Sequence, residues 1–296
     1  MIRQDPNSAD VAENADCFWS LIRTDAIRSA SKQMRADMMV LGADFYLNSH
    51  PPPNQKLRCL KRSFLLWRKA TRLVPTHDPH WTPYQLHNFV VTMWKLYEAK
   101  QDRRLLAPII TLARQLSLDH RTSLKEAPAY YCMISAASLE QCRHSNDDKD
   151  LFAAIDACAD MLGEPQDTAN ARVLVGKILK ELDSRRDRLL SLPDFRHWLD
   201  TIFPRVAILK RNPPDEAVCA LVGALFQFYI TLPVSESTST AAELASAVFI
   251  AARRDWANLQ IAYCHLGMVY RALFQHTQDQ AFLVRAIKTM AAASEC

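Results

Sequence analysis

The chain has 296 residues, of which 49% are hydrophobic and 23% charged, so a folded core is expected and wholesale disorder is excluded. Only 5 residues are glycine, where about 7% of a chain is usual, and this scarcity argues against Gly-rich phosphate loops, a nucleotide-binding α/β sheet and a turn-rich β-sandwich. Because glycine costs more inside a helix than any residue except proline, the composition favours an all-α protein.

The net charge of +4 is divided unevenly along the chain. Residues 1–125 hold 19 lysines and arginines against 11 acidic residues, and the remainder holds 17 against 21. A basic first half could offer a face to nucleic acid or to an acidic partner. Two ordinary solvated surfaces are the alternative interpretation.

The first residues carry four acids and no apolar run, which predicts a polar tail over residues 1–15 and no signal peptide. The 8 cysteines include no C-x2-C pair, so we expect no zinc site and a reducing compartment. The longest uncharged stretch, 217–235, contains polar residues and a proline and predicts a buried helix rather than a membrane span. We therefore expect an intracellular protein of the cytoplasm or nucleus.

Along the chain, prolines separate segments of about 15–20 residues whose apolar positions lie three and four apart, as in amphipathic helices. The first clear boundary is the triple proline at 51–53. A second follows Pro79, where Thr82 and Gln85 have capping-box spacing and Pro83 occupies the first helical position. No segment shows the period-two alternation of a strand.

Six of these segments share one pattern, a polar first residue with an apolar anchor four positions later and a second apolar residue after four more. The first positions are Lys56, Asp102, Asp147, Asp194, Thr240 and Asp279. The anchors are Leu60, Leu106, Leu151, Trp198, Leu244 and Leu283, spaced by 46, 45, 47, 46 and 39 residues. The second apolar residues are Phe64, Ile110, Ile155, Ile202, Val248 and Ile287.

Aspartate and threonine at five of the six first positions are good helix N-caps, since their side-chain oxygens accept from unpaired backbone N–H groups. A further helical run precedes each cap, so each unit reads as helix, turn and second helix. One helical pair cannot bury its apolar face alone. We therefore expect residues 16–296 to form a single α-solenoid of about six helix–turn–helix repeats, with a period near 46 and a right-handed superhelix.

The last unit, 262–293, resembles the tetratricopeptide (TPR) family. Leu266, Gly267 and Tyr270 stand as the L-G-x2-Y of its first helix, and Ala286 stands as the small residue of its second. The long period is also similar to that of HEAT-type repeats. The segment GADFYLNSHPPPNQKLRCL (42–60) resembles the TPR-type subunit of the cohesin loader. Such resemblances imply a superhelix whose first helices line a concave surface.

The segment 56–72, KLRCLKRSFLLWRKATR, carries seven basic residues, and no acidic residue occurs from 45 to 77. On a helical wheel, one apolar stripe is formed by Leu57, Leu60, Phe64, Trp67 and Thr71. Leu65 falls among the cations beside that stripe, which predicts a docking surface for phosphates or an acidic peptide. A solvated helix is the alternative. The predicted partner-binding residues are Arg58, Lys61, Arg62, Leu65, Arg68, Lys69 and Arg72.

Other clusters point to structure rather than chemistry. His77, Asp78, His80 and His87 lie in or beside a Pro-rich connection without metal-ligand spacing. The acidic run from Asp147 to Asp150 is better explained by helix capping. Trp81, Trp94, Trp198 and Trp256 are expected in the core. We expect no catalytic, cofactor-binding or metal-binding residues.

On these grounds we expect a non-catalytic scaffold or adaptor subunit of a larger complex, which binds an extended or acidic segment of a protein partner on its concave or basic surface, without a cofactor and away from membranes. The alternative is a nucleic-acid-binding helical-repeat protein, chromatin-associated or part of a nucleoprotein, that uses the basic first half. A helical enzyme with an unrecognised site is the third hypothesis.

Overall fold

The computed structural model describes residues 20–21, 23–48, 51–119, 121–122, 126–163, 168–207, 220–221, 224–225, 228, 263, 267, 270–271, 274–275 and 278–295. Within these ranges the regular structure is helical and contains no strand, which confirms the all-α prediction. The chain divides into two compact units, Met1–His144 and Ser145–Cys296. Over the described ranges, no helix is long and apolar enough to cross a membrane.

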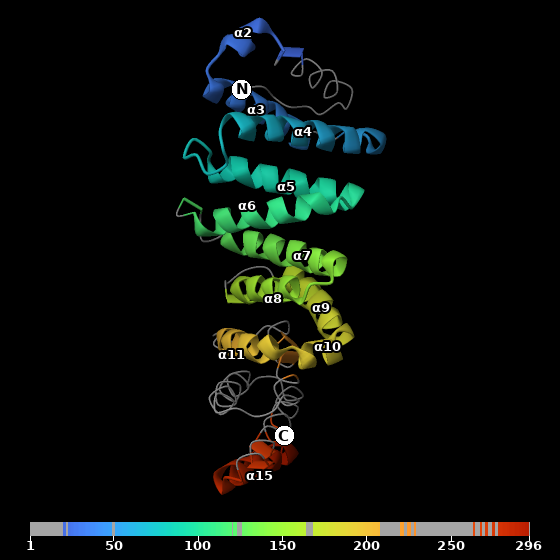
Figure 1. The fold of residues 1–296 in the computed structure, drawn as a ribbon, viewed down its shortest axis with the longest axis vertical. Coiled ribbons are helices and arrows are strands. Elements are labelled where there is room, and N and C mark those ends of the chain that lie inside the picture. The colour runs from blue at the N-terminus through green and yellow to red at the C-terminus, as the bar shows by residue number, and fades with distance from the viewer. Residues whose placement is uncertain are drawn as a thin grey trace. The chain divides into compact units, whose positions relative to one another are not determined.

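The first unit is a series of helices that pack in chain order (Figure 1). The helices are α2 (Asp25–Ser29), α3 (Lys32–Asn48), α4 (Pro53–Leu73), α5 (Pro83–Lys100), the 3-10 turn η1 (Arg103–Leu105), α6 (Leu106–Leu118) and α7 (Ala127–Ser145). Helix α3 packs on α4, and α5 packs on both α4 and α6. The short connections from α3 to α4 and from α5 to α6 make each of these pairs a helical hairpin.

Aromatic side chains join α4 to α5 in the core of this unit. Trp67 stacks on Phe89 with ring centroids 5.1 Å apart, and its ring lies 5.9 Å from that of Trp81. The Trp81 indole N–H donates to the carbonyls of Val74 and Pro75, at 3.1 and 2.9 Å. The connection between α4 and α5 is therefore tied to the core, and Trp81 is buried as expected.

The second unit contains α8 (Asp148–Gly163), α9 (Thr168–Ser184), α10 (Arg186–Ser191), α11 (Pro193–Ala207) and α15 (Gln280–Glu295). Helix α8 packs on α9 and on α11. Phe152 of α8 stacks on Trp198 of α11, with 4.4 Å between ring centroids, and Phe195 lies 5.8 Å from Phe152. Stacked aromatic rings therefore hold α8 against α11.

Several predicted helix starts are confirmed by side-chain capping bonds. Thr82 and Gln85 form the reciprocal capping box with Pro83 at the first helical position. The aspartates that accept from the backbone N–H two residues on, at 2.9 to 3.1 Å, are Asp102, Asp147 and Asp279. These bonds satisfy donors that the helix itself leaves unpaired.

Two predicted starts were wrong. Helix α4 begins at Pro53 rather than after Lys56, because a proline at the first turn has the required φ and needs no N–H partner. Helix α11 begins at Pro193 for the same reason, which places Asp194 inside the first turn rather than at the cap. Asp194 still lies where a negative charge is favoured by the helix dipole.

The apolar anchors of the first three sequence repeats are buried, and the described anchors of later repeats are less buried. Leu60, Leu106 and Leu151 are buried, whereas Trp198 and Leu283 are only half-buried. Of the residues four positions on, Ile155 and Ile202 are fully buried, Phe64 and Ile110 are partly buried, and Ile287 is 62% exposed. Ile287 therefore does not belong to the core.

Trp94 also departs from its prediction as a core residue. It is half-buried, and its indole N–H donates to Glu98 Oε1 at 3.0 Å. Several expectations fall outside the described residues: the tail over 1–15, the capping box of Thr240 and Glu243, the apolar Leu244 and Val248, and Trp256. Within 217–235, the described residues are helical, and Leu221, Leu225 and Phe228 are buried.

Candidate interaction surface on helix α4

The inner face of α4 is broader than the predicted stripe. Its buried residues are Leu60, Ser63, Leu66, Trp67 and Ala70, whereas Leu57, Phe64 and Thr71 are only partly buried. The prediction missed Ser63 because a hydroxyl looks solvent-facing in sequence. Its side chain donates to the carbonyl of Ala43 on α3 at 2.9 Å and lies 3.3 Å from the Thr92 hydroxyl on α5. These bonds remove the cost of burying it.

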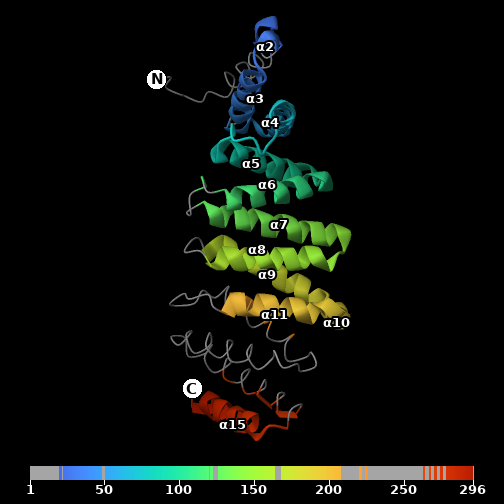
Figure 2. The same ribbon diagram turned by 60° about the vertical axis from the view of Figure 1, so that its left-hand side comes forward.

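The outer face of α4 carries a basic stripe, defined here as Arg58, Lys61, Leu65, Arg68 and Arg72, all of them exposed. Successive members are three, four, three and four residues apart, so they follow one line along the helix. At about 1.5 Å per residue the line is roughly 21 Å long. Helix α4 is seen nearly end-on beside α3 in Figure 2, which shows how its outer side can stay free of α3.

The other two predicted partner-binding residues, Lys69 and Arg62, differ in their exposure. Lys69 is exposed next to the basic stripe. Arg62 is half-buried, because its guanidinium lies over the ring of Tyr46 on α3, 5.6 Å from the centroid, and hydrogen-bonds to the Tyr46 hydroxyl at 3.3 Å. Arg62 therefore ties α3 to α4, a role that the sequence did not reveal because its partner lies 16 residues away in another helix.

Among the described residues, the cations of the basic stripe have no carboxylate partner, a property they share with the exposed Arg103, Arg104 and Arg114. In the described chain, no ion pair involves Arg58, Lys61, Arg68 or Arg72. Arg68 only lies over the ring of Phe64, 5.8 Å from the centroid. Arginines paired with carboxylates at 2.5 to 3.5 Å are Arg28, Arg121, Arg143, Arg188 and Arg205.

This arrangement has an electrostatic cost for the free protein. Like charges three and four residues apart repel by a few tenths of a kcal/mol per pair. No acid in the first turn of α4 offsets the cations near its N-terminus, where the helix dipole already disfavours positive charge. Burial of Trp67 and Leu66 on the opposite face holds the helix in place despite this repulsion. An anionic partner would relieve it.

Leu65 gives the basic stripe an apolar centre. Its side chain is 45% exposed, with Lys61 and Arg68 as its neighbours along the line. A single exposed leucine is ordinary on a protein surface. Its position at the middle of an unneutralised cationic line is what distinguishes it, because a ligand that neutralises the cations would also cover it.

The histidines of the Pro-rich connection do not assemble into one site. His80 Nε2 lies 2.7 Å from Asp37 Oδ1 on α3, and Asp78 accepts from the backbone N–H of His80 at 2.9 Å. The ring of His87 instead packs edge-on against Tyr130, and burial lowers the pKa of His87. The described residues contain no group of three His, Cys, Asp or Glu side chains placed to hold a metal ion.

The acidic run at the start of α8 serves the fold. Asp147 caps the helix, and Asp148 is only 4% exposed. The Asp148 carboxylate pairs with Arg185 at 3.2 Å and with Arg188 at 2.8 Å. Arg185 lies between α9 and α10, and Arg188 lies in α10. This ion-pair group therefore ties the start of α8 to the junction of α9 and α10.

A polar cluster between α5 and α7 was not foreseen. The Tyr97 hydroxyl donates to Glu140 Oε2 at 3.1 Å and lies 3.2 Å from His144 Nε2. Burial and the neighbouring carboxylate of Glu140 raise the pKa of Tyr97 to about 12. The phenol therefore keeps its proton near neutral pH and links two helices.

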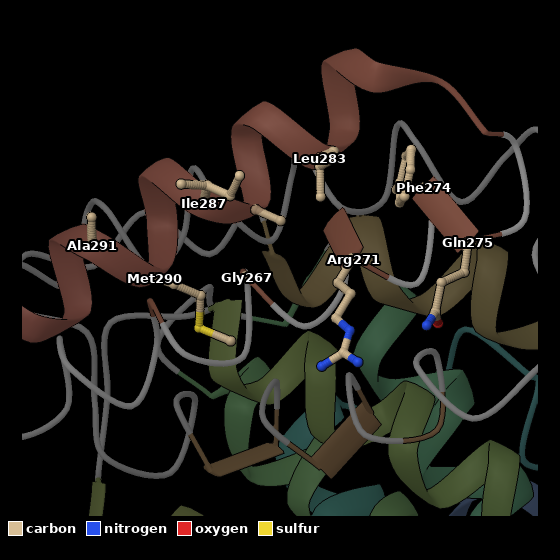
Figure 3. Close-up of a pocket in the computed structure, with 9 residues that line it drawn as sticks. Gly267, Arg271, Phe274, Gln275, Leu283, Ile287, Met290 and Ala291 are labelled. Carbon is tan, nitrogen blue, oxygen red and sulfur yellow. The ribbon is translucent and has the colours of Figure 1, made fainter.

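Described residues near the end of the chain line a cavity of about 510 Å³. Its lining is mainly apolar and comprises Gly267, Arg271, Phe274, Gln275, Leu283, Ala286, Ile287, Met290 and Ala291. Figure 3 shows the apolar side chains along α15 and the Arg271 side chain pointing away from that helix. None of the described lining residues is an acid, a histidine, a cysteine or a serine, so we describe the cavity as an open packing face.

Comparison with known proteins adds no assignment, since no family model, no curated protein and no solved structure matches this chain. The basic stripe of α4 is therefore the candidate site on the strength of its own geometry and charge.

Proposed function

We propose that the protein is a non-catalytic scaffold, an α-solenoid of TPR-like hairpins wound as a right-handed superhelix, that binds an acidic segment of a partner protein through α4. The solenoid is supported by helices of the first unit that pack in chain order and by caps at the repeated positions Asp102, Asp147 and Asp279. The observation that carries the binding function is the line of four exposed cations without carboxylate partners.

A second candidate function is nucleic-acid binding. Residues 1–144 hold 20 lysines and arginines against 13 acidic residues, so the first unit as a whole is basic. Phosphate binding would neutralise the basic stripe equally well, but it would leave Leu65 without an apolar contact. The exposed leucine at the centre of the stripe therefore favours a protein partner.

The test is capture of partners from native lysate by three forms of the full chain. The surface variant reverses Lys61, Arg68 and Arg72 to glutamate and leaves Arg62 intact, because Arg62 supports the packing of α3. The control variant reverses Lys177, Lys180 and Lys288, which are exposed on α9 and α15. Both variants change the net charge by the same amount, and circular dichroism checks that each is folded.

We expect the surface variant to lose at least nine-tenths of one captured protein that the wild type and the control retain. Nuclease treatment of the lysate should leave that capture unchanged. Capture that nuclease abolishes would support the nucleic-acid function instead. Equal capture by all three forms would show that the stripe is only a solvated surface.

A further inference from the structure

We infer that the occupant of the basic stripe is an amphipathic α-helix whose acidic residues repeat with the same three–four spacing, with one apolar residue seated on Leu65. This inference rests on the proposed function, in that it takes α4 as the docking surface for an acidic protein. It adds the conformation of the bound segment and the position of its apolar contact.

The charges along α4 are spaced to match the side chains of a second helix. From Arg58 to Arg72, neighbouring members of the stripe are separated along the helix axis by about 4.5 Å or about 6 Å, for three or four residues. A second helix presents side chains at these same intervals, so each carboxylate can meet a cation. The stripe averages 3.5 residues per step, which is the repeat of helices that pack along a common seam.

An extended segment does not keep this register. Side chains on one face of a strand recur about every 6.7 Å, so four steps of the segment cover roughly 27 Å against about 21 Å for the stripe. Carboxylates that pair with Lys61 would fall several ångströms away from Arg72. The geometry of α4 therefore selects a helical partner over the extended segment that the sequence led us to expect.

The cations around Leu65 are complementary to a helix that carries acids on both sides of one apolar residue. Its neighbours one turn away in both directions are basic, namely Lys61, Arg62, Arg68 and Lys69. A partner helix with acids on both sides of one leucine or methionine would neutralise these cations and cover the 45% of Leu65 that is exposed. The apolar contact would fix the register, because sliding the partner by one turn would place its apolar residue against a cation.

The basic stripe of α4 is already in position in the free protein. Helix α4 is fixed from behind by Trp67, which is fully buried, and by the Ser63 hydroxyl bond to α3 at 2.9 Å. The basic stripe therefore needs no rearrangement before it binds, and only its long side chains become ordered.

The test uses two synthetic alanine–glutamine peptides of equal composition. In the first, four glutamates flank one leucine with the three–four spacing of the stripe. In the second, the same residues occupy alternate positions, as an extended segment requires. Binding to the full chain is measured by fluorescence anisotropy at low ionic strength, where surface charges are least screened.

We expect the first peptide to bind at least tenfold more tightly than the second. Leu65→Ala should weaken that binding several-fold and should have no effect on a first peptide whose leucine is replaced by alanine. The lysine control variant at 177, 180 and 288 should bind like the wild type.

Equal binding of the two peptides, lost in the surface variant, would overturn the helical occupant while the acidic docking surface stands. Tighter binding of the alternating peptide would replace the helix with an extended segment. If the first peptide does not bind at all, the inference fails whatever the lysate capture shows.

Discussion

Asp44 is a carboxyl that the fold holds against its preferred ionisation. It lies on α3, where burial raises the pKa of Asp44 to about 6, and the nearby Asn88 amide offsets part of that rise. Its Oδ1 atom is buried without a hydrogen-bond partner. Because the folded pKa exceeds the ordinary aspartate pKa of 3.8, the folded state binds the proton more tightly than the unfolded state does. Ionisation of Asp44 therefore destabilises the fold as pH rises through this interval.

Asp44→Asn should remove that penalty. At pH 7 we expect a gain of about 1 kcal/mol, discounted for solvent screening because the side chain is only partly buried, and a thermal midpoint a few degrees higher. Near pH 4, where Asp44 is protonated in the fold, the variant and the wild type should unfold together. Differential scanning calorimetry at both pH values measures this.

Exposed Asp183 on α9 provides the control, since Asp183→Asn should not shift the midpoint by more than about one degree at either pH. A stabilisation by Asp44→Asn that is the same at both pH values would mean that the cost arises from packing rather than from ionisation.

At the scale of helices, α15 lies very close to the backbone at Gly267. A Cβ atom built on Gly267 would lie 2.7 Å from Met290 Cγ and 2.9 Å from Met290 Sδ on α15, which is closer than atoms pack. The ring of Tyr270, three residues later, stacks on Phe282 with 6.4 Å between centroids, and Ala286 is buried. Three residues of the TPR-like pattern, Gly267, Tyr270 and Ala286, thus lie where this segment meets α15.

Gly267 and Met290 should therefore be coupled. Alanine in place of a helical glycine normally gains about 1 kcal/mol. We expect Gly267→Ala to give that gain only in a Met290→Ala background, and to be neutral or destabilising with Met290 present. A double-mutant cycle of unfolding free energies should show at least about 1 kcal/mol of coupling.

Gly176 is a matched control, because it is an exposed glycine in α9 with nothing within 4 Å of its built Cβ. Gly176→Ala should stabilise the protein by about 1 kcal/mol in either background. Additive effects at Gly267 and Met290 would contradict the close contact.

Local signals in the sequence predicted four of the helix starts, because a cap involves only neighbours. Thr82 with Gln85 and the three capping aspartates act within one turn, so their spacing is visible in the chain. The starts at Pro53 and Pro193 were misplaced because the prediction assigned them to Lys56 and Asp194. A proline can begin a helix without a side-chain cap.

The candidate site was predicted in part, because some of its features are also local in the sequence. The cations of α4 are visible as residue types, and helical periodicity places most of them on one face. That Arg62 turns inward to Tyr46, and that Ser63 is buried, depends on α3 and α5, which pack from other parts of the chain. Contacts across 16 to 29 residues leave no periodic trace in a sequence.

For the whole molecule, the proposed solenoid makes a specific claim about cooperativity. In a helical-repeat protein each repeat contacts only its neighbours, so a local defect should spread only a short way. The group of Asp148 with Arg185 and Arg188 is a suitable place for such a defect. The Arg185 side chain is only 11% exposed, so removal of Asp148 leaves a largely buried cation without this partner.

Asp148→Ala should cost about 2 kcal/mol locally, because it removes the charged hydrogen bonds to Arg185 and Arg188, although Glu181 still pairs with Arg185 at 3.5 Å. Hydrogen exchange followed by mass spectrometry should show faster exchange in α8, α9 and α10. Helices α3 and α4 should keep their protection, and binding of the acidic peptide to the basic stripe should be unchanged. A uniform loss of protection along the whole chain would instead indicate one globular core, and the solenoid proposal would then fail.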